Sequence, residues 1–401
     1  MDERKNKRLR PEDFVPNDPA AEAKKRKKLL KRLLSLTLLL LVVLGIVLAA
    51  AYWDLNSFDS LRRRLSYNKV EQDEQGKARL YTYSSDRTDL FAAFSDRLLI
   101  ASTTSIRLLG EGGEELYNES IPLEHPAIAV GKNEAAVYDV GGSALYLFDR
   151  KGFLRDMSVS GGGIISVSLN VAGHLALTTK QSGCKSQVSV FDNEGAERFT
   201  FRSSEYYVSD AFVLPDGGHL ALTALTEKDG SFASEMQFYS LSSETPNAAR
   251  SIEGSLVLEA RTVDNSVMLV SDDCVAALSL DGRELGRYQY ELPYLRGYDF
   301  GGRDFAALVL SRYRSGYAGR IVSVGANGKM IAALDTGQEI LDISAAGSYL
   351  AVLYSNSLTI YTRDLNEYAL LTGTDYASGV FMREDGTALL TGETGAWLFI
   401  P

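Results

Sequence analysis

The sequence predicts an all-β fold, an eight-bladed β-propeller, preceded by a single transmembrane α-helix. Three observations carry this prediction. An uncharged apolar run fills residues 33–53, a turn-and-strand pattern recurs eight times after it at a mean spacing of about 41 residues, and the chain ends three strands into the last copy. Four short strands per period of about 40 residues are typical of a propeller blade. A seven-bladed ring is the nearest alternative.

The charge of the chain is distributed very unevenly. The 401 residues include 42 Lys and Arg against 52 Asp and Glu, a net charge of −10. Residues 1–32 carry a net charge of +6, residues 33–53 carry none, and the remaining residues carry −16. The acidic outer part argues against nucleic acid as a partner. Two cysteines exclude a disulfide-built scaffold and a four-cysteine zinc site.

Residues 33–53 have the length and composition of a membrane span. They contain no Asp, Glu, Lys, Arg, His or Pro and end in Tyr52 and Trp53. A helix of this length spans about 30 Å, and aromatic rings favour the membrane interface. A cleavable signal peptide, with residues 49–51 as its small-residue site, is the alternative. We favour an uncleaved anchor because the run exceeds the roughly 7–15 apolar residues of a signal core.

The basic residues that flank the span predict its orientation. Lys and Arg fill most of residues 24–32, directly before the span, whereas Arg62–Arg64 and Lys69 lie further away on the other side. The positive-inside rule therefore predicts that residues 1–32 are a disordered, basic, cytoplasmic tail and that the C-terminal domain lies outside the cell membrane. Residues 54–77 are expected to form a linker. Phe58, Leu61 and Leu65 in it have the spacing of a short amphipathic helix.

The outer part is built from recurring strands. The clearest pair of copies is AGHLALT at residues 172–178 and GGHLALT at residues 217–223. The turns between strands often contain Asp-Gly or Asn-Gly, as at residues 281–282 and 327–328, and these pairs favour tight hairpins. The eight copies are anchored on residues 97, 134, 174, 219, 266, 304, 349 and 387.

The two ends of this region predict how the ring closes. The last copy stops after its third strand, at residues 397–400, and an unmatched strand at residues 78–83 precedes the first copy. We therefore expect a propeller domain over residues 78–401, in which strand 78–83 pairs with the last blade. Such pairing leaves no exposed sheet edge.

The recurring strands resemble those of WD-type and quinoprotein-like propellers. With its basic tail and single anchor, the whole chain resembles uncharacterised membrane-anchored β-propeller proteins of Gram-positive bacteria, a domain-of-unknown-function family. No copy ends in a Trp-Asp pair, since Trp53 and Trp397 are the tryptophans of the chain. Residues 333–337 (ALDTG) match part of a quinoprotein blade motif but lack the tryptophan that should follow. The resemblance therefore implies a membrane location, no quinone or other cofactor, and no established activity.

The sequence offers little catalytic chemistry. His174 and His219 occupy one repeat position that other copies fill with various polar residues, so they are expected in turns. No His pair has ligand spacing, and no nucleophile elbow, phosphate loop or EF-hand motif occurs. We predict no catalytic, cofactor-binding or metal residues and expect Cys184 and Cys274 to be unbridged. A carboxylate or metal site in the central channel stays open, because each blade would contribute one ligand.

The two faces of a propeller differ in their connections. First-to-second and third-to-fourth strand connections lie on one face, here the turn face. Second-to-third and blade-to-blade connections lie on the other, here the junction face. The longer connections, residues 180–187, 226–235, 288–298 and 311–320, belong to the junction face. Tyr and Arg are enriched at binding hot spots. The binding-face candidates are therefore Tyr290, Tyr294, Arg296, Tyr298, Arg312, Tyr313, Arg314, Tyr317 and Arg320.

The leading functional interpretation is a binding or scaffolding module for an envelope protein or polymer, anchored in the membrane by one helix. Because the closing strand enters from the turn face, the junction face is expected to point away from the anchor. One alternative is a propeller hydrolase or lactonase-like enzyme with a metal in the central channel. Another is a ligand sensor that acts through the anchor.

Overall fold

The computed structural model describes residues 19–52, 59, 63, 66–68, 70–86, 88–228, 230–317 and 319–401. The chain divides into two units, Met1–Leu65 and Ser66–Pro401. The expected amphipathic helix on Phe58, Leu61 and Leu65 lies outside the described residues, as do residues 1–18 of the expected tail.

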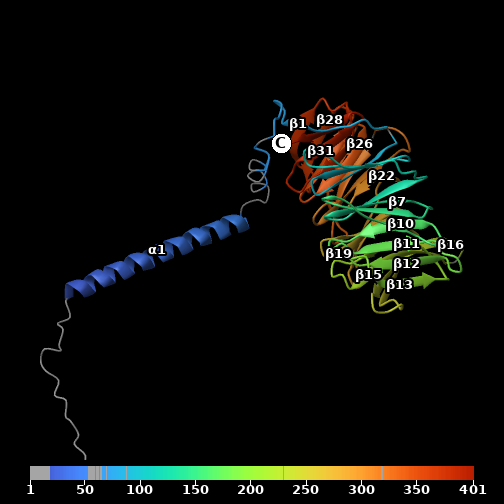
Figure 1. The fold of residues 1–401 in the computed structure, drawn as a ribbon, viewed down its shortest axis with the longest axis horizontal. Helices are drawn as coiled ribbons and strands as arrows, with labels where there is room; N and C mark the ends of the chain where they lie inside the picture. Colours follow the sequence, from blue (N-terminus) through green and yellow to red (C-terminus); the bar gives the residue numbers. More distant parts are fainter. Residues whose placement is uncertain are drawn as a thin grey trace, which may run out of the picture. The chain divides into compact units, whose positions relative to one another are not determined.

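The first unit contains α1 (Pro19–Tyr52), one continuous helix (Figure 1). Its segment Lys28–Ile46 has a mean hydropathy of 2.3 and is long and apolar enough to cross a membrane, a property that a signal sequence shares. The helix begins earlier than the sequence analysis expected, since residues 19–32 are helical rather than disordered. The reason is local: proline is favoured in the first helical turn, and the Ala, Lys and Arg residues that follow have high helix propensity.

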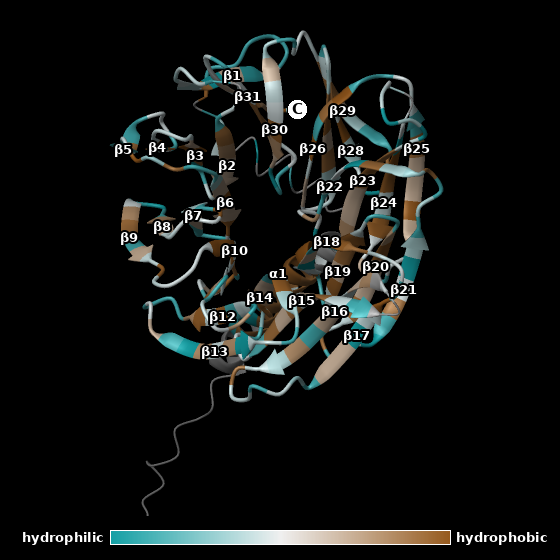
Figure 2. Ribbon diagram, turned by 90° about the vertical axis from the view of Figure 1, so that its right-hand side faces the viewer, coloured by the Kyte–Doolittle hydropathy of each residue, from teal (hydrophilic) through white to brown (hydrophobic). Residues whose placement is uncertain are grey.

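The described part of the second unit folds into eight four-stranded antiparallel sheets arranged as a ring (Figure 2). This confirms the eight-bladed propeller and excludes the seven-bladed alternative. Blade 1 comprises β2 (Leu90–Phe94), β3 (Arg97–Ala101), β4 (Ile106–Leu109) and β5 (Glu115–Glu119). Blade 2 comprises β6 (Pro126–Val130), β7 (Glu134–Asp139), β8 (Ala144–Asp149) and β9 (Gly152–Ser158). Blade 3 comprises β10 (Ile164–Leu169), β11 (Leu175–Thr179), β12 (Ser186–Phe191) and β13 (Glu197–Ser203).

The chain continues around the ring with one blade per repeat. Blade 4 comprises β14 (Tyr207–Val213), β15 (His219–Lys228), β16 (Ser231–Ser240) and β17 (Ala248–Ile252). Blade 5 comprises β18 (Val257–Val263), β19 (Ser266–Ser271), β20 (Cys274–Ser279) and β21 (Glu284–Gln289). Blade 6 comprises β22 (Tyr294–Asp299), β23 (Phe305–Ser311), β24 (Gly319–Gly325) and β25 (Met330–Thr336). Blade 7 comprises β26 (Ile340–Ala346), β27 (Tyr349–Tyr354), β28 (Ser357–Thr362) and β29 (Glu367–Thr372).

Blade 8 is assembled from both ends of the propeller. It contains β30 (Ala377–Met382), β31 (Ala388–Gly392) and β32 (Gly395–Phe399), with β1 (Lys77–Thr82) as its outermost strand. The pairing of β1 with β32 is antiparallel, with Ala78 opposite Leu398 and Thr82 opposite Gly395. The closing strand that the sequence indicated at residues 78–83 is therefore present.

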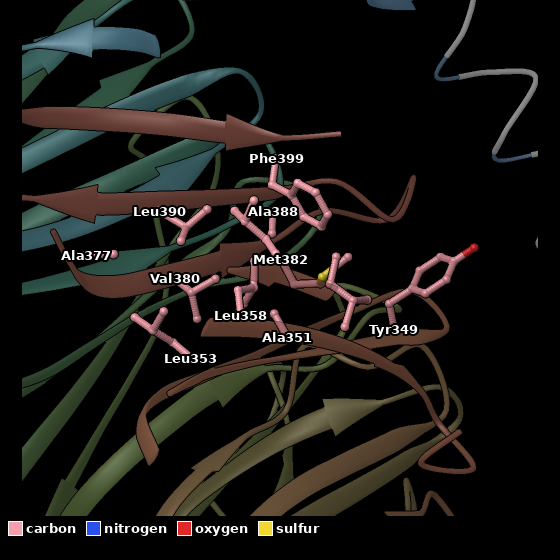
Figure 3. Packing of buried hydrophobic residues seen from close by; sticks show 12 residues of the cluster. Tyr349, Ala351, Leu353, Leu358, Ala377, Val380, Met382, Ala388, Leu390 and Phe399 are labelled. Carbon is pink, nitrogen blue, oxygen red and sulfur yellow. The ribbon is translucent and has the colours of Figure 1, made fainter. Parts of the chain in front are cut away.

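The core lies between neighbouring blades. One cluster joins β27 and β28 of blade 7 to β30 and β31 of blade 8, as Leu353, Leu358, Val380 and Leu390 illustrate (Figure 3). Similar clusters join the other neighbouring pairs. The second strand of a blade is covered on both faces, so β19, β23 and β27 are buried at every residue. This explains why all eight repeat anchors fall within one residue of the start of a second strand.

The innermost strands carry a feature that the sequence analysis did not predict. In blades 3 to 8 the register of the innermost strand shifts by one residue against its neighbour, near the junction face. Such a bulge leaves one residue unpaired and turns its side chain out of the regular alternation. The innermost strands of blades 1 and 2, β2 and β6, are described in full and pair without a shift. The unpaired residues are Ile165, Ser209, Leu258, Arg296, Leu341 and Ser378.

We predict that Tyr81→Ala weakens the propeller by about 3–5 kcal/mol, the usual cost of deleting a buried aromatic ring. Tyr81 on β1 is 1% exposed and packs in the cluster that joins blade 8 to blade 1. The matched control is Tyr313→Ala, at a residue that is 58% exposed, which should change stability by less than about 0.5 kcal/mol. Urea denaturation of the full chain in detergent measures both. Equal midpoints for the two variants would show that β1 does not secure the ring.

Candidate functional site

In blade 4 the junction face carries an extended hairpin instead of the long connection that the sequence predicted. Residues 226–235 were expected to be a long connection, but β15 and β16 continue as ten-residue strands that pair as far as Lys228 and Ser231. Asp229 and Gly230, which lie between them in the sequence, are a pair that two-residue hairpins favour, and Gly230 has a φ of +78°. The result is a projecting hairpin on which the Phe232 side chain is 67% exposed.

Six of the nine predicted binding residues come together on the junction side of blade 6. We call this group the blade 6 cluster. Arg296, the unpaired residue of the β22 bulge, donates a hydrogen bond to the carbonyl of Arg314. The Arg314 guanidinium lies 5.8 Å from the centre of the Tyr294 ring, within the range of a cation–π interaction. The cluster consists of Tyr294, Arg296, Arg312, Tyr313, Arg314 and Tyr317.

The blade 6 cluster offers an open contact surface. Its four residues in the connection between β23 and β24, Arg312, Tyr313, Arg314 and Tyr317, are exposed. A hollow of about 230 Å³ beside them is lined by Arg296, Arg314 and Tyr317 together with residues 338–340, where the chain passes into blade 7.

The other three predicted binding residues, Tyr290, Tyr298 and Arg320, have structural partners outside the blade 6 cluster. The Tyr290 hydroxyl donates to the carbonyl of Ser271 at 3.0 Å, and burial raises the pKa of this phenol. Tyr298 points into the central channel, where its hydroxyl donates to the Glu259 carboxylate at 3.0 Å. Arg320 on β24 forms ion pairs with Glu291 and with Asp335, its cross-strand neighbour on β25.

Sequence reasoning missed the apolar part of the junction face. Of the described propeller residues, sixteen large apolar side chains are exposed, and nine of them lie on this face. The turn face has two, Val130 and Val171, and the other five lie on outermost strands. Leu258 and Leu341 are the unpaired residues of the bulges in β18 and β26, and their side chains are 54% and 43% exposed. The nine are Leu90, Val140, Tyr207, Phe232, Leu256, Leu258, Tyr313, Tyr317 and Leu341.

Carboxylates line the central channel, one of the two possibilities that the sequence analysis kept open for it. Arg261 lies 2.7 Å from Asp210 and 3.0 Å from Glu259, measured between nitrogen and oxygen atoms. Asp299 accepts hydrogen bonds from the backbone amides of Gly301 and Ala345, although burial still raises the pKa of its carboxyl. Among the residues that the structure describes, no three His, Cys, Asp or Glu side chains are placed to hold one metal ion.

A second hollow, the acidic cavity, opens among blades 7, 8 and 1 and has a volume of about 850 Å³. It lies on the junction side, because blade-to-blade and second-to-third connections contribute to its lining. Leu90, Phe91, Leu341 and Phe381 form apolar walls. The charged residues among the described lining are all acidic: Asp86, Asp89, Asp342, Asp375 and Glu393.

Comparison with known proteins places the chain in a family. A family described as "Family of unknown function (DUF5711)" matches residues 66–370. The chain belongs to DUF5711. The matched region of this DUF5711 member begins at Ser66, where the propeller unit begins. No curated protein matches the chain.

Solved structures that resemble this DUF5711 member are propellers of low sequence identity. The C-terminal WD40 domain of Sif2 has a TM-score of 0.56 and 13% sequence identity, and the alignment covers 80% of this chain and 99% of that domain. BamB from Moraxella catarrhalis has a TM-score of 0.51 and 10% identity, with coverage of 80% of this chain and 98% of that chain. The computationally designed Ika8 protein has a TM-score of 0.58 and 10% identity, with coverage of 80% of this chain and 99% of that chain. At these identities the likeness establishes the fold.

The Asp342 carboxyl makes the stability of the propeller depend on pH. Burial raises its pKa from 3.8 to about 6, although the amides of Ile343 and Val380 donate to it. Because the folded-state pKa lies above the unfolded one, ionised Asp342 destabilises the fold above pH 6, and this cost falls as pH drops toward 4.

We therefore predict that the stability of Asp342→Asn relative to the wild type rises by about 1–3 kcal/mol between pH 4.5 and pH 7.5. The Asn amide nitrogen cannot accept the second backbone hydrogen bond, so a constant cost offsets this gain at every pH. Thermal unfolding of both proteins over this pH range measures the effect. A difference that is constant with pH would show that Asp342 titrates normally.

Proposed function

We propose that this protein is a single-pass membrane protein whose extracytoplasmic propeller binds a protein partner of the cell envelope through its junction face. The observation that carries the proposal is the concentration of exposed apolar side chains, nine of sixteen in the described propeller, on that one face. Such surfaces mark interaction sites on proteins that are otherwise polar outside. Apolar contacts favour a protein partner over a polar envelope polymer.

The composition of the junction face supports this proposal. The blade 6 cluster presents exposed tyrosines and arginines, which dominate binding energy at many interfaces. Leu258, Leu341 and Phe232 supply apolar contacts elsewhere on the same face.

The turn face is the side on which the chain enters the propeller. The Tyr67 hydroxyl donates a hydrogen bond to the Asp385 carboxylate at 3.0 Å and accepts one from the Arg383 guanidinium at 3.2 Å. Arg383 and Asp385 both lie in the connection between β30 and β31. The amide of Ile400 donates to the carbonyl of Gly76, just before β1. This arrangement supports the proposal that α1 anchors the turn side and leaves the junction face open to a partner.

The channel residues favour binding over metal-dependent hydrolysis. Glu259 and Asp210 both form ion pairs with Arg261, and Asp299 accepts hydrogen bonds from two backbone amides. Each of these carboxylates therefore already has a partner within the protein. A hydrolase or lactonase-like activity would need several of them to converge on one ion.

We predict that a photoreactive benzoylphenylalanine at Tyr317 or at Leu258 cross-links one and the same envelope protein in intact cells. The yield should exceed that from Val171, on the turn face, or Met330, on an outermost strand, at least fivefold. Adding Tyr313→Ala and Arg314→Ala to the Leu258 variant should lower the yield about tenfold, since truncated hot-spot residues cost about 1–2 kcal/mol each. Equal cross-linking from both faces would contradict the assignment of the face.

We predict that a membrane-impermeant thiol reagent labels Glu244→Cys, at an exposed turn-face residue, in intact cells, and labels Asn6→Cys only after the membrane is opened. Cys184→Ser provides the background, because Cys274 is buried. An epitope tag at the N-terminus should stay on the full-length protein. Loss of the tag would indicate a cleaved signal sequence, and the reverse labelling pattern would indicate the opposite orientation.

A further inference from the structure

The acidic cavity is distinct from the blade 6 cluster in both charge and shape. Of its five acidic residues, Asp89 lies 3.8 Å from Arg107, measured between the carboxylate and the guanidinium. For Asp86, Asp342, Asp375 and Glu393 the structure describes no cation within ion-pair distance. Among its described lining residues the cavity therefore combines a net negative charge with apolar walls.

The backbone creates the space in this cavity. Leu341 is the unpaired residue of the β26 bulge and is 43% exposed, so its side chain forms part of the wall rather than of the core. Gly379 occupies the position after the bulge in β30. A Cβ at this glycine would lie 2.7 Å from the Thr391 hydroxyl and 3.5 Å from an Asp342 oxygen. A larger residue would therefore fill the space beside Asp342.

The dimensions of the cavity suit a side chain rather than a metal ion. A volume of about 850 Å³ falls within the roughly 300–1,000 Å³ typical of small-ligand pockets. The described acidic residues come from three blades and do not converge in threes on one point. A long cationic side chain can contact several such carboxylates in turn, while its aliphatic stem packs on Phe91 or Leu341.

We propose that the acidic cavity receives a Lys or Arg side chain, adjacent to an apolar residue, from a segment of the partner protein. This inference rests on the proposed function, since it names the chemistry by which the junction face selects its partner. Complementary charge at an interface raises the association rate and suppresses wrong partners. The cavity therefore contributes specificity, while the exposed leucines and the blade 6 cluster contribute contact area.

A second copy of this chain is the competing occupant. The arginines of the blade 6 cluster lie on the same face as the acidic cavity, so two junction faces related by a twofold axis could pair them. The proposed anchoring from the turn side would disfavour this arrangement, because two junction faces that point away from one membrane would not face each other. Self-association is therefore treated as an outcome of the test.

The test is selection of random twelve-residue peptides, displayed on phage, against the full chain in lipid nanodiscs. The wild type should enrich peptides in which Lys or Arg lies next to Leu, Ile or Phe. A selected basic peptide should bind Asp375→Asn/Glu393→Gln at least tenfold more weakly. The matched control Glu244→Gln/Glu384→Gln also removes two exposed acidic groups, but on the turn face, and should bind within twofold of the wild type.

A second pair of variants tests the cavity by adding a positive charge. Leu341→Lys places an ammonium group at the cavity wall and should abolish binding of the basic peptide. Leu154→Lys places the same ammonium group on the outermost strand β9, where Leu154 is 40% exposed and lies outside both the cavity and the junction face, and should retain binding. This pair keeps the test valid if the neutralised double variant folds poorly.

Each result has a defined meaning. Enriched peptides without basic residues, or equal binding to the neutralised variant, would overturn the cavity assignment and leave the proposed binding face standing. No enrichment at all would contradict both proposals. Dimerisation of the wild type in sedimentation, lost in Asp375→Asn/Glu393→Gln, would identify a second copy as the occupant and overturn the inference.

Discussion

Closure of the ring by β1 is the constraint on which the rest of the structure depends. A propeller blade buries its faces only between two neighbours, so an open ring would expose an apolar sheet face at each end. Here a strand from residues 77–82 pairs with one from residues 395–399, and Tyr81 packs into the cluster between blades 8 and 1. This single pairing fixes the first and last blades together. It also determines that the chain enters on the turn face.

The position of the strands within each blade explains why the two faces differ. Second strands are enclosed between neighbouring blades and keep a regular register, whereas innermost strands border the central channel and accommodate an extra residue. The extra residue falls near the junction face in six blades. The bulges turn Leu258, Arg296 and Leu341 out of the sheet alternation. The apolar and basic character of the junction face thus follows partly from how the ring is assembled.

The sequence predicted the ring better than the site, for physical reasons. A strand buried on both faces leaves a continuous apolar signature, so Leu350 and Leu389 mark their blades clearly. A bulge leaves no such signature, since the same leucine can fill a core or an exposed position. The partners of Tyr298 and Arg320 belong to another blade and to a neighbouring strand, and the acidic cavity collects residues as distant as Asp86 and Glu393. Only the folded ring brings these groups together.

Hydrogen–deuterium exchange of the full chain in native membranes, compared with the purified protein in detergent, tests the central claim most directly. If the junction face carries the partner, residues 207–209, 256–258, 312–317 and 375–379 should exchange more slowly in native membranes. The turns at residues 171–173, 281–283 and 384–386 on the opposite face should exchange equally in both samples. Protection confined to the turn face, or no difference on either face, would contradict the account.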